Sequence, residues 1–140
     1  MMPNDATLKT LLQTCKRIAI VGLSDKPERP SYRVAAYLQA AGYTIYPVNP
    51  AINSVLGQKA YANLSDIPDP IDMVDVFRKS DEVPQILADT LAIGASVLWL
   101  QEGVVHEAAA AQGQAAGLTV IMDRCTKKEH QRLKVSNCSE

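Results

Sequence analysis

The sequence predicts an α/β fold: one domain whose doubly wound, mainly parallel sheet carries helices on both faces. Short apolar runs alternate along the chain with segments whose apolar residues recur at helical spacing. Such continuous runs are typical of strands that are buried on both faces, as in a parallel sheet. The 140 residues fit one compact core, and no composition shift or long Gly/Ser linker divides them.

The two ends of the chain flank this domain. Residues 134–140 form a polar tail that is expected to fray. Residues 1–17 are expected to form a short helix that packs on the domain, with Asn4 or Asp5 as its N-cap. The apolar side of this helix consists of Leu8, Leu11, Leu12 and Cys15.

The domain itself is expected over residues 18–133. Its first strand is the apolar run 18–21, which ends at a glycine. The charged loop 23–30 then leads to a helix that begins near Ser31 and precedes a second strand at residues 44–48.

Three more strands are expected further along the chain. Residues 51–70 carry no strong helix signal and are predicted to be a loop region with a short strand near residues 59–61. Apolar runs then predict strands at residues 72–77, 96–100 and 118–122.

Helices are predicted between and after these strands. An alanine-rich helix covers residues 104–116, and a helix over residues 126–133 would begin with a capping box of Thr126 and Glu129. Ser80 is a candidate N-cap for an earlier helix. The buried stripe of that earlier helix would be Val83, Ile86, Leu87 and Leu91.

Composition and charge exclude several classes of protein. The net charge of -1 provides no basic field, so we expect no nucleic-acid partner. No run of about 20 apolar residues predicts a membrane span, and residues 1–16 lack the basic and apolar regions of a signal peptide. Cys15, Cys125 and Cys138 form no paired motif, which favours a reducing, cytoplasmic location.

Candidate site residues follow from the predicted topology. In an open parallel sheet, ligands bind beyond the carboxyl ends of the strands. We expect no metal site, because His and Cys residues do not cluster. The residues that follow the predicted strands are Gly22, Leu23, Ser24, Asn49, Pro50, Phe77, Arg78, Lys79, Gln101, Glu102, Gly103, Asp123, Arg124 and Cys125.

The loop after the first strand suits a phosphate group. Gly22 allows a ligand to approach the backbone closely, Ser24 and Ser31 supply hydroxyls, and the helix near Ser31 directs free N–H groups at the loop. Three cations lie within a few residues: Lys26, Arg29 and Arg33.

The same loop departs from that of a NAD-binding protein. The G-x-G-x-x-G fingerprint is absent. Asn49 and Pro50 stand where a ribose-binding carboxylate would follow the second strand. Both departures disfavour NAD as the ligand.

Six segments, most of them at strand ends, carry a family resemblance. They are residues 18–24 (IAIVGLS), 31–35 (SYRVA), 46–50 (YPVNP), 75–78 (DVFR), 99–104 (WLQEGV) and 122–125 (MDRC). In this order they resemble the small, single-domain CoA-binding proteins. Their Rossmann-like domain is similar to the nucleotide half of the succinyl-CoA synthetase α subunit.

The resemblance implies that the chain binds coenzyme A or an acyl-CoA at the carboxyl edge of its sheet, as a non-catalytic protein. An acid after the second strand would repel the 3′-phosphate on the ribose of CoA, and none is present there. The resemblance implies that the diphosphate contacts Gly22, Leu23 and Ser24, and that other phosphates contact Ser31 and Arg33. The 3′-phosphate would contact Lys26 and Arg29, and adenosine would contact Asn49 and Pro50. Adenine and the extended arm would contact Val76, Phe77 and Arg78, and pantetheine would contact Gln101, Gly103 and Val104.

Two alternatives stay open: an enzyme that uses NADP or an acyl-CoA, and a subunit of a synthetase-like assembly. Arg29 or Arg33 would suit the 2′-phosphate of NADP. The synthetase also needs a phosphorylated histidine from a second domain. We expect His106 to be a surface or capping residue and His130 to face solvent, so we assign no catalytic residue.

Two further features are interpreted as structural. Asp72 and Asp75 are expected at the ends of a strand or on its opposite faces, and not as an acid–base pair. Cys125 precedes a predicted helix, which suits either a structural residue or a thiol that exchanges with the CoA sulfhydryl. Self-association or a protein partner stays open as well.

Overall fold

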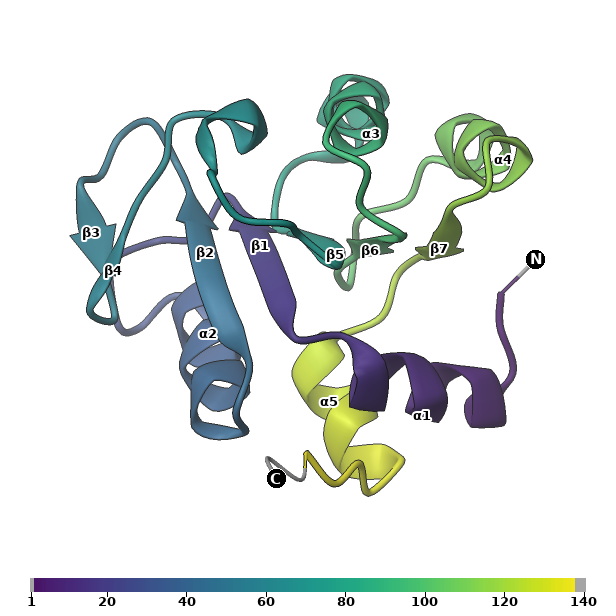
Figure 1. The fold of residues 1–140 in the computed structure, drawn as a ribbon, viewed down its shortest axis with the longest axis horizontal. Helices are drawn as coiled ribbons and strands as arrows, with labels where there is room; N and C mark the ends of the chain where they lie inside the picture. Colours follow the sequence, from purple (N-terminus) through teal and green to yellow (C-terminus); the bar gives the residue numbers. More distant parts are fainter. Residues whose placement is uncertain (1, 138–140) are drawn as a thin grey trace.

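A computed structural model describes residues 2–137 and shows a five-stranded parallel sheet between two layers of helices (Figure 1). The predicted α/β fold with a doubly wound sheet is confirmed. No helix within residues 2–137 is long and apolar enough to cross a membrane. In spatial order, the strands are β2 (Thr44–Val48), β1 (Arg17–Val21), β5 (Met73–Val76), β6 (Val97–Leu100) and β7 (Thr119–Ile121).

The direction of winding reverses between β1 and β5. From β1 the chain reaches β2 through helix α2 (Pro30–Ala40), and it then returns to β5 on the other side of β1. From β5 it continues through α3 (Val83–Ala92) to β6 and through α4 (Glu107–Ala115) to β7. Because such crossovers are right-handed, α2 covers one face of the sheet while α3 and α4 cover the other (Figure 1). The switch point, where ligands bind in sheets of this kind, is therefore the carboxyl end of β1 and β5.

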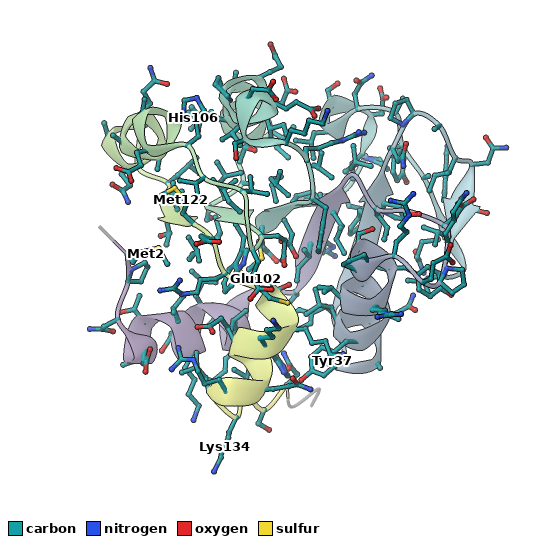
Figure 2. The ribbon with its side chains drawn as sticks, turned by 180° about the vertical axis from the view of Figure 1, so that it is seen from behind. Met2, Tyr37, Glu102, His106, Met122 and Lys134 are labelled. Atoms are coloured by element: carbon teal, nitrogen blue, oxygen red, sulfur yellow. The ribbon has the colours of Figure 1, made fainter. Side chains whose placement is uncertain are left out.

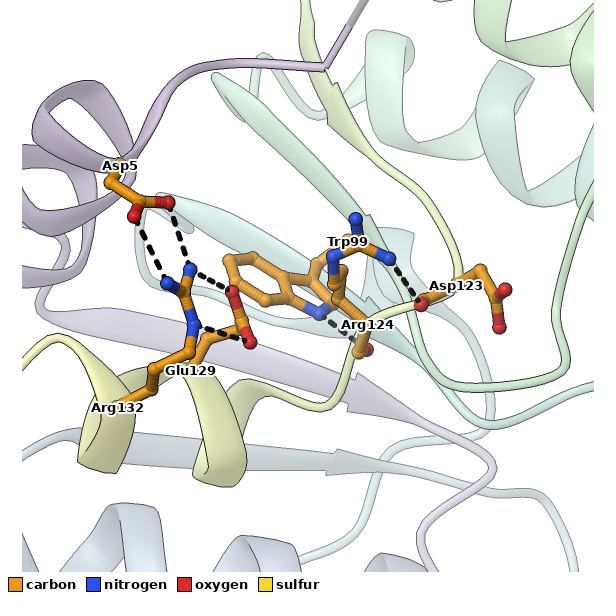
Figure 3. A network of polar contacts seen from close by, with 6 residues as sticks. All are labelled: Asp5, Trp99, Asp123, Arg124, Glu129 and Arg132. Atoms are coloured by element: carbon orange, nitrogen blue, oxygen red, sulfur yellow. Dashed lines mark hydrogen bonds and ion pairs between the residues drawn. The ribbon is translucent and has the colours of Figure 1, made fainter.

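Alternate side chains of each strand enter two separate cores, which fill the space between the sheet and its helices (Figure 2). Val74 and Val76 face α3 and α4. Met73 and Trp99 lie on the opposite side, which is covered by α1 (Asp5–Thr14), α2 and α5 (Thr126–Arg132). Trp99 is wholly buried, and its Nε1 donates to the Arg124 carbonyl at 2.9 Å (Figure 3). Burial on both faces explains why the strands are continuous apolar runs in the sequence.

The N-terminal helix forms as predicted. The Asn4 side chain caps it by accepting the Thr7 N–H at 2.9 Å. An ion pair joins α1 to α5, because the Arg132 guanidinium lies 2.9 Å from Asp5 and 2.7 Å from Glu129 (Figure 3). These contacts fix α1 beside α5 beneath the sheet.

A small hairpin lies within the predicted loop region. Strands β3 (Ser54–Val55) and β4 (Gln58–Lys59) pair in antiparallel register. The two turn residues, Leu56 and Gly57, both have positive φ, and the Gln39 side chain donates to the Leu56 carbonyl at 3.0 Å. The short strand expected near residues 59–61 ends at Lys59, and Tyr61 makes only an isolated parallel bridge to β2. A 3₁₀ turn, η1 (Leu64–Asp66), follows. Strands of two residues are too short for a period-2 pattern to reveal them.

Three predictions about helices are wrong. Residues 80–82 form a 3₁₀ turn, η2 (Ser80–Glu82), and the Ser80 hydroxyl accepts the Val105 N–H at 2.9 Å instead of capping α3. The cap of α5 is Cys125, without a capping box, because the Thr126 hydroxyl contacts Asp75. Leu91, placed in the buried stripe of α3, is 40% exposed.

His130 is buried, contrary to the prediction that it faces solvent. Its Nδ1 lies 2.7 Å from the Tyr37 hydroxyl, and its Nε2 contacts the Asn137 side chain. The Val135 N–H donates to the His130 carbonyl, so residues 134–137 fold back on α5. The last residues of the tail, 138–140, lie outside the described residues.

Replacing His130 with alanine should lower the free energy of unfolding by about 1–3 kcal/mol, because the Tyr37 hydroxyl loses a buried partner. Urea unfolding followed by circular dichroism measures the change. The matched control is Gln131→Ala at the next, exposed position of α5, which should change the free energy by less than about 0.5 kcal/mol. Equal, small effects at both positions would contradict the burial of His130.

Candidate functional site

The carboxyl ends of β1, β2 and β5 meet at the switch point. As the chain leaves β1, the Gly22 N–H donates to the Val48 carbonyl of β2 at 2.9 Å. On the other side, the Phe77 N–H donates to the Val21 carbonyl at 2.8 Å. The first loop is therefore tied to the end of both neighbouring strands.

Gly22 brings the first loop into contact with the end of β5. Its φ is +87°, and a Cβ built on it would lie 2.5 Å from the Phe77 carbonyl oxygen and 3.3 Å from the Arg78 Cδ. Only glycine fits this position, because any side chain would clash and the backbone is left-handed. The structure therefore explains Gly22 by the close approach of the Phe77 backbone, and the approach of a ligand at this glycine stays a prediction.

Three side chains hold the first loop in shape. The Ser31 hydroxyl is buried and accepts the Ser24 N–H at 3.0 Å. The Ser24 hydroxyl accepts the Lys26 N–H at 3.1 Å. Asn49, at the end of β2, donates its side-chain N–H to the Leu23 carbonyl at 3.0 Å. Ser31 and Asn49 thus act on the loop itself, which the sequence pattern did not indicate.

Basic side chains surround this loop without acidic partners. Residues 22–33 contain three basic and two acidic residues, and Arg78 of the neighbouring loop adds a fourth cation. No ion pair within residues 2–137 uses any of these cations, and no side chain caps the N-terminus of α2. The cations are Lys26, Arg29 and Arg33, which are exposed, and Arg78, which is half-buried.

At the next strand end, the Gln101 side chain turns inward. Gln101 follows β6 and is 4% exposed. Its Nε2 donates to Asp75 Oδ1 at 2.6 Å and to the Thr126 hydroxyl oxygen at 2.9 Å. The Thr126 hydroxyl in turn donates to Asp75 Oδ2 at 3.0 Å. These three side chains form a buried network, the Asp75 network, that joins β5, β6 and the start of α5.

Asp75 is a carboxylate with no exposed surface. Burial raises the pKa of Asp75 to about 7, and the hydrogen bonds from Gln101 and Thr126 limit that rise. Asp72, at the other end of β5, accepts the N–H groups of Lys16 and Arg17 at 2.8 and 2.9 Å. The two acids are separate, as predicted, and Asp75 lies buried within β5.

The loops after β6 and β7 satisfy their own polar groups. The Gly103 N–H donates to Asp123 Oδ1 at 2.7 Å, and Asp123 itself has a φ of +61°. Glu102 pairs with Lys128 at 3.1 Å. His106 caps α4 by accepting the Ala109 N–H at 3.1 Å, so the helix begins later than predicted.

On the side of the molecule nearest the N-terminus, two backbone N–H groups donate to methionine sulfur atoms. The His106 N–H donates to the Met122 Sδ, and the Met122 N–H donates to the Met2 Sδ. Figure 2 shows these three residues along one side of the molecule. No group of three His, Cys, Asp or Glu side chains within residues 2–137 is placed to hold a metal.

The predicted site residues divide by the direction of their side chains. Exposed or half-buried side chains at the edge belong to Ser24, Lys26, Arg29, Arg33, Asn49, Pro50, Phe77 and Arg78. Gly103 is exposed, whereas Ser31 and Cys125 are buried. Four further side chains point into the protein and leave only backbone for a ligand: Leu23, Val76, Gln101 and Val104.

A cavity of about 500 Å³ lies elsewhere, between α1 and the amino ends of β5, β6 and β7. Its lining is dominated by small and hydroxyl side chains, among them Thr7, Thr10 and Thr14, with Asp72 as its one charged residue. This cavity lacks the cations of the opposite edge. The carboxyl edge therefore remains the candidate site.

Comparison with known proteins identifies the family. Residues 16–131 match a family model described as a CoA binding domain. The chain belongs to the CoA-binding domain family. The uncharacterized protein YneT of Bacillus subtilis (strain 168) is 48% identical over 128 residues, which cover 91% of this chain and 95% of that protein. The predicted resemblance is confirmed.

Two further relatives extend the comparison. A hypothetical protein from Pyrococcus horikoshii OT3 superimposes on this CoA-binding domain with a TM-score of 0.91 and 39% identity, covering 94% of this chain and 93% of that one. An ADP-forming acetate–CoA ligase II from Archaeoglobus fulgidus is 33% identical over 76 residues, 53% of this chain but 11% of the ligase. The chain therefore spans nearly the whole of its small relatives and about a tenth of the ligase.

Gly22→Ala should destabilise this CoA-binding domain more than Gly103→Ala. Both glycines have positive φ, +87° and +84°, so either substitution costs about 1–2 kcal/mol for the left-handed backbone. A Cβ at Gly103 meets nothing within 4 Å, whereas one at Gly22 meets the Phe77 carbonyl. We expect Gly22→Ala to cost a further 1–3 kcal/mol or so in urea unfolding. Equal losses would mean that the first loop moves freely away from Phe77.

The stability of the chain should depend on the ionisation of Asp75. Its folded pKa of about 7 lies above the unfolded value of about 3.9, so the folded state holds the proton more tightly. The resulting stabilisation is fully present below about pH 4 and is lost as the pH rises through about 7, roughly 4 kcal/mol in all.

Urea unfolding between pH 4 and pH 8 tests this dependence. Asp75→Asn cannot ionise, so its stability should fall less than that of the wild type over this range. The control is Asp89→Asn on α3, where the native carboxylate accepts a hydrogen bond from Gln85 and the amide oxygen can still do so. Asp89→Asn should keep the wild-type profile; an unchanged profile in Asp75→Asn would contradict the assignment.

Proposed function

We propose that this chain binds coenzyme A, or an acyl-CoA, across the carboxyl edge of its sheet, as a non-catalytic protein of the cytoplasm. One observation carries the proposal: the Gly22 backbone contacts the end of β5, the nearby cations form no ion pair within residues 2–137, and no carboxylate follows β2. Membership of the CoA-binding domain family supports the same ligand.

The first loop suits the diphosphate. The Leu23 N–H donates to no group within residues 2–137 and is available to a phosphate oxygen. Arg78 packs its stem against Gly22, which brings a guanidinium to the same loop. Arg33, in the uncapped first turn of α2, adds a second cation beside the positive end of the helix dipole. Backbone N–H groups, a helix end and arginines are the usual components of a phosphate site.

The region beside β2 suits the adenosine and its 3′-phosphate. Asn49 and Pro50 carry no negative charge, and Lys26 and Arg29 are exposed in the adjacent loop. A 3′-phosphate bound there would face cations on one side and no acid at the strand end. This arrangement favours CoA over NAD, which needs an acid for its ribose hydroxyls.

The other half of the edge suits the neutral pantetheine arm. The Gln101, Val76 and Val104 side chains are buried, so backbone groups and the exposed Gly103 would line the arm. Phe77 is half-buried and would present part of its ring at the centre of the edge. Pantetheine carries amides and no charge, which matches an edge where Glu102 pairs with Lys128 and Asp123 accepts the Gly103 N–H.

The arrangement at the edge does not provide a reactive pair. His106 caps α4, His130 is bonded to Tyr37 and Asn137, and Asp75 is fully buried. A nucleophile within hydrogen-bond reach of a base is the usual signature of covalent catalysis. A carrier, sensor or partner protein is therefore the preferred form of the proposal. The second candidate, a subunit of a synthetase-like assembly, rests on the match to part of the acetate–CoA ligase.

Calorimetric titration with CoA, dephospho-CoA and NADPH tests the proposal. CoA should bind, and dephospho-CoA and NADPH should bind more weakly, because one lacks the 3′-phosphate and the other carries its phosphate elsewhere. Arg33→Ala and Arg78→Ala should each weaken CoA binding about tenfold or more, as expected for charge-assisted hydrogen bonds. Lys9→Ala removes the same charge from α1, at the opposite edge, and should leave the affinity unchanged.

Each other outcome has a definite meaning. NADPH bound more tightly than CoA would favour the enzyme. Failure of the folded chain to bind CoA would contradict the proposal and favour a subunit that needs its assembly.

A further inference from the structure

The Asp75 network lies directly beneath the proposed ligand edge. Asp75 is two residues before Phe77, whose carbonyl meets the first loop, so it is about 7 Å along the strand from that contact. Gln101 is the first residue after β6, and Thr126 begins α5. Each member of the network is thus one or two residues from an edge loop.

The hydrogen bonds of this network match the ionised carboxylate. Gln101 Nε2 uses one hydrogen for Asp75 and one for Thr126, and the Thr126 hydroxyl gives its hydrogen to Asp75. Both carboxylate oxygens therefore only accept. A proton on Asp75 Oδ2 would face the Thr126 hydrogen, so the hydroxyl would have to turn and accept instead. Protonation therefore rearranges the contact between β5 and α5.

No cation within residues 2–137 forms an ion pair with Asp75. The neighbouring strands place Ile20 and Trp99 beside it. α1 and α2 bury apolar side chains toward this face, with Ser31 as the one polar exception, and Arg33 stays exposed.

The other ionisable groups on this side have partners elsewhere or are buried. On α5, Glu129 pairs with Arg132, and His130 contacts Tyr37 and Asn137. Cys125 and Cys15 are buried, as is Tyr43, whose hydroxyl donates to the Leu12 carbonyl. Among the described residues, the charge on Asp75 is stabilised by hydrogen bonds and by no ion pair, so it is sensitive to any negative charge that is added at the edge.

We propose that Asp75 is a proton-linked positioning residue: when the phosphates of CoA bind at the edge, the Asp75 carboxylate takes up a proton from solvent and becomes a neutral carboxylic acid. This inference rests on the proposed function. Phosphate anions near a buried carboxylate disfavour its charged form, because the protein interior screens the repulsion poorly. Burial already holds the pKa of Asp75 at about 7, so the exchange occurs near neutral pH. The affinity for CoA should consequently fall as the pH rises above neutrality.

Proton uptake is measured directly by calorimetry in two buffers of different ionisation enthalpy at pH 7.5. Dephospho-CoA is the first probe, because it lacks the phosphate monoester, a group that titrates near pH 6 and would exchange protons itself. The wild type should take up a substantial fraction of one proton, and Asp75→Asn should take up almost none. Asp89→Asn should match the wild type. From pH 6.5 to pH 8.5 the wild-type affinity should fall several-fold, whereas that of Asp75→Asn should stay nearly constant.

A second variant, Thr126→Val, keeps the carboxyl group and removes one donor. Loss of this hydrogen bond raises the pKa of Asp75, so the pH at which proton uptake is greatest should move upward. A purely structural role for Thr126 would not move it. Where dephospho-CoA binds too weakly, CoA is titrated and the difference between wild type and Asp75→Asn gives the proton count.

The outcomes separate this inference from the proposed function. Equal proton counts in the wild type and Asp75→Asn would overturn the inference and leave CoA binding intact. An uptake profile unmoved by Thr126→Val would overturn it as well. No binding of CoA by the folded wild type at any pH would overturn the proposed function, and the inference with it.

Discussion

The candidate site depends on the contact between the Gly22 backbone and the carbonyl of Phe77. β1 and β5 are parallel neighbours, and the chain that leaves β1 has to turn at once over the end of β5. A left-handed glycine is the residue that allows this turn with another backbone at contact distance. This turn then determines where α2 begins, and therefore where Arg33 and the uncapped N–H groups of that helix lie. Ser31 and Asn49 then brace the loop from both sides.

The edge that results is chemically asymmetric. Within residues 2–137, the cations around the first loop form no ion pair and the Leu23 N–H has no acceptor, whereas around β6 and β7 two carboxylates have partners within the protein. Glu102 pairs with Lys128, and Asp123 accepts the Gly103 N–H. Coenzyme A has the same asymmetry, with all its phosphates in the nucleotide half and a neutral pantetheine arm. The match in polarity supports the proposed direction of the ligand along the edge.

The sequence predicts what local chemistry decides and misses what distant partners decide. The five strands of the sheet follow from apolar runs, and the strand ends correctly locate the loops of the edge. Ser80 and Thr126 each precede an acidic residue in a pattern typical of helix caps, yet Val105 and Asp75, both distant along the chain, take their hydroxyls. His130 likewise finds its partners in another helix and in the returning tail. Burial of a polar side chain is therefore the part of this site that spacing alone cannot predict.

Asp75 is difficult to explain by stability alone. A carboxyl group within an apolar strand loses its hydration, and no cation within residues 2–137 forms an ion pair with it to offset that loss. A well-packed apolar side chain at this position would avoid the penalty, provided that Gln101 and Thr126 were replaced as well. The three polar residues are thus a unit whose hydrogen bonds satisfy one another at some expense of stability. Because this unit joins β5, β6 and α5 immediately below the proposed phosphate loops, its location favours a role in the site over a role in the core.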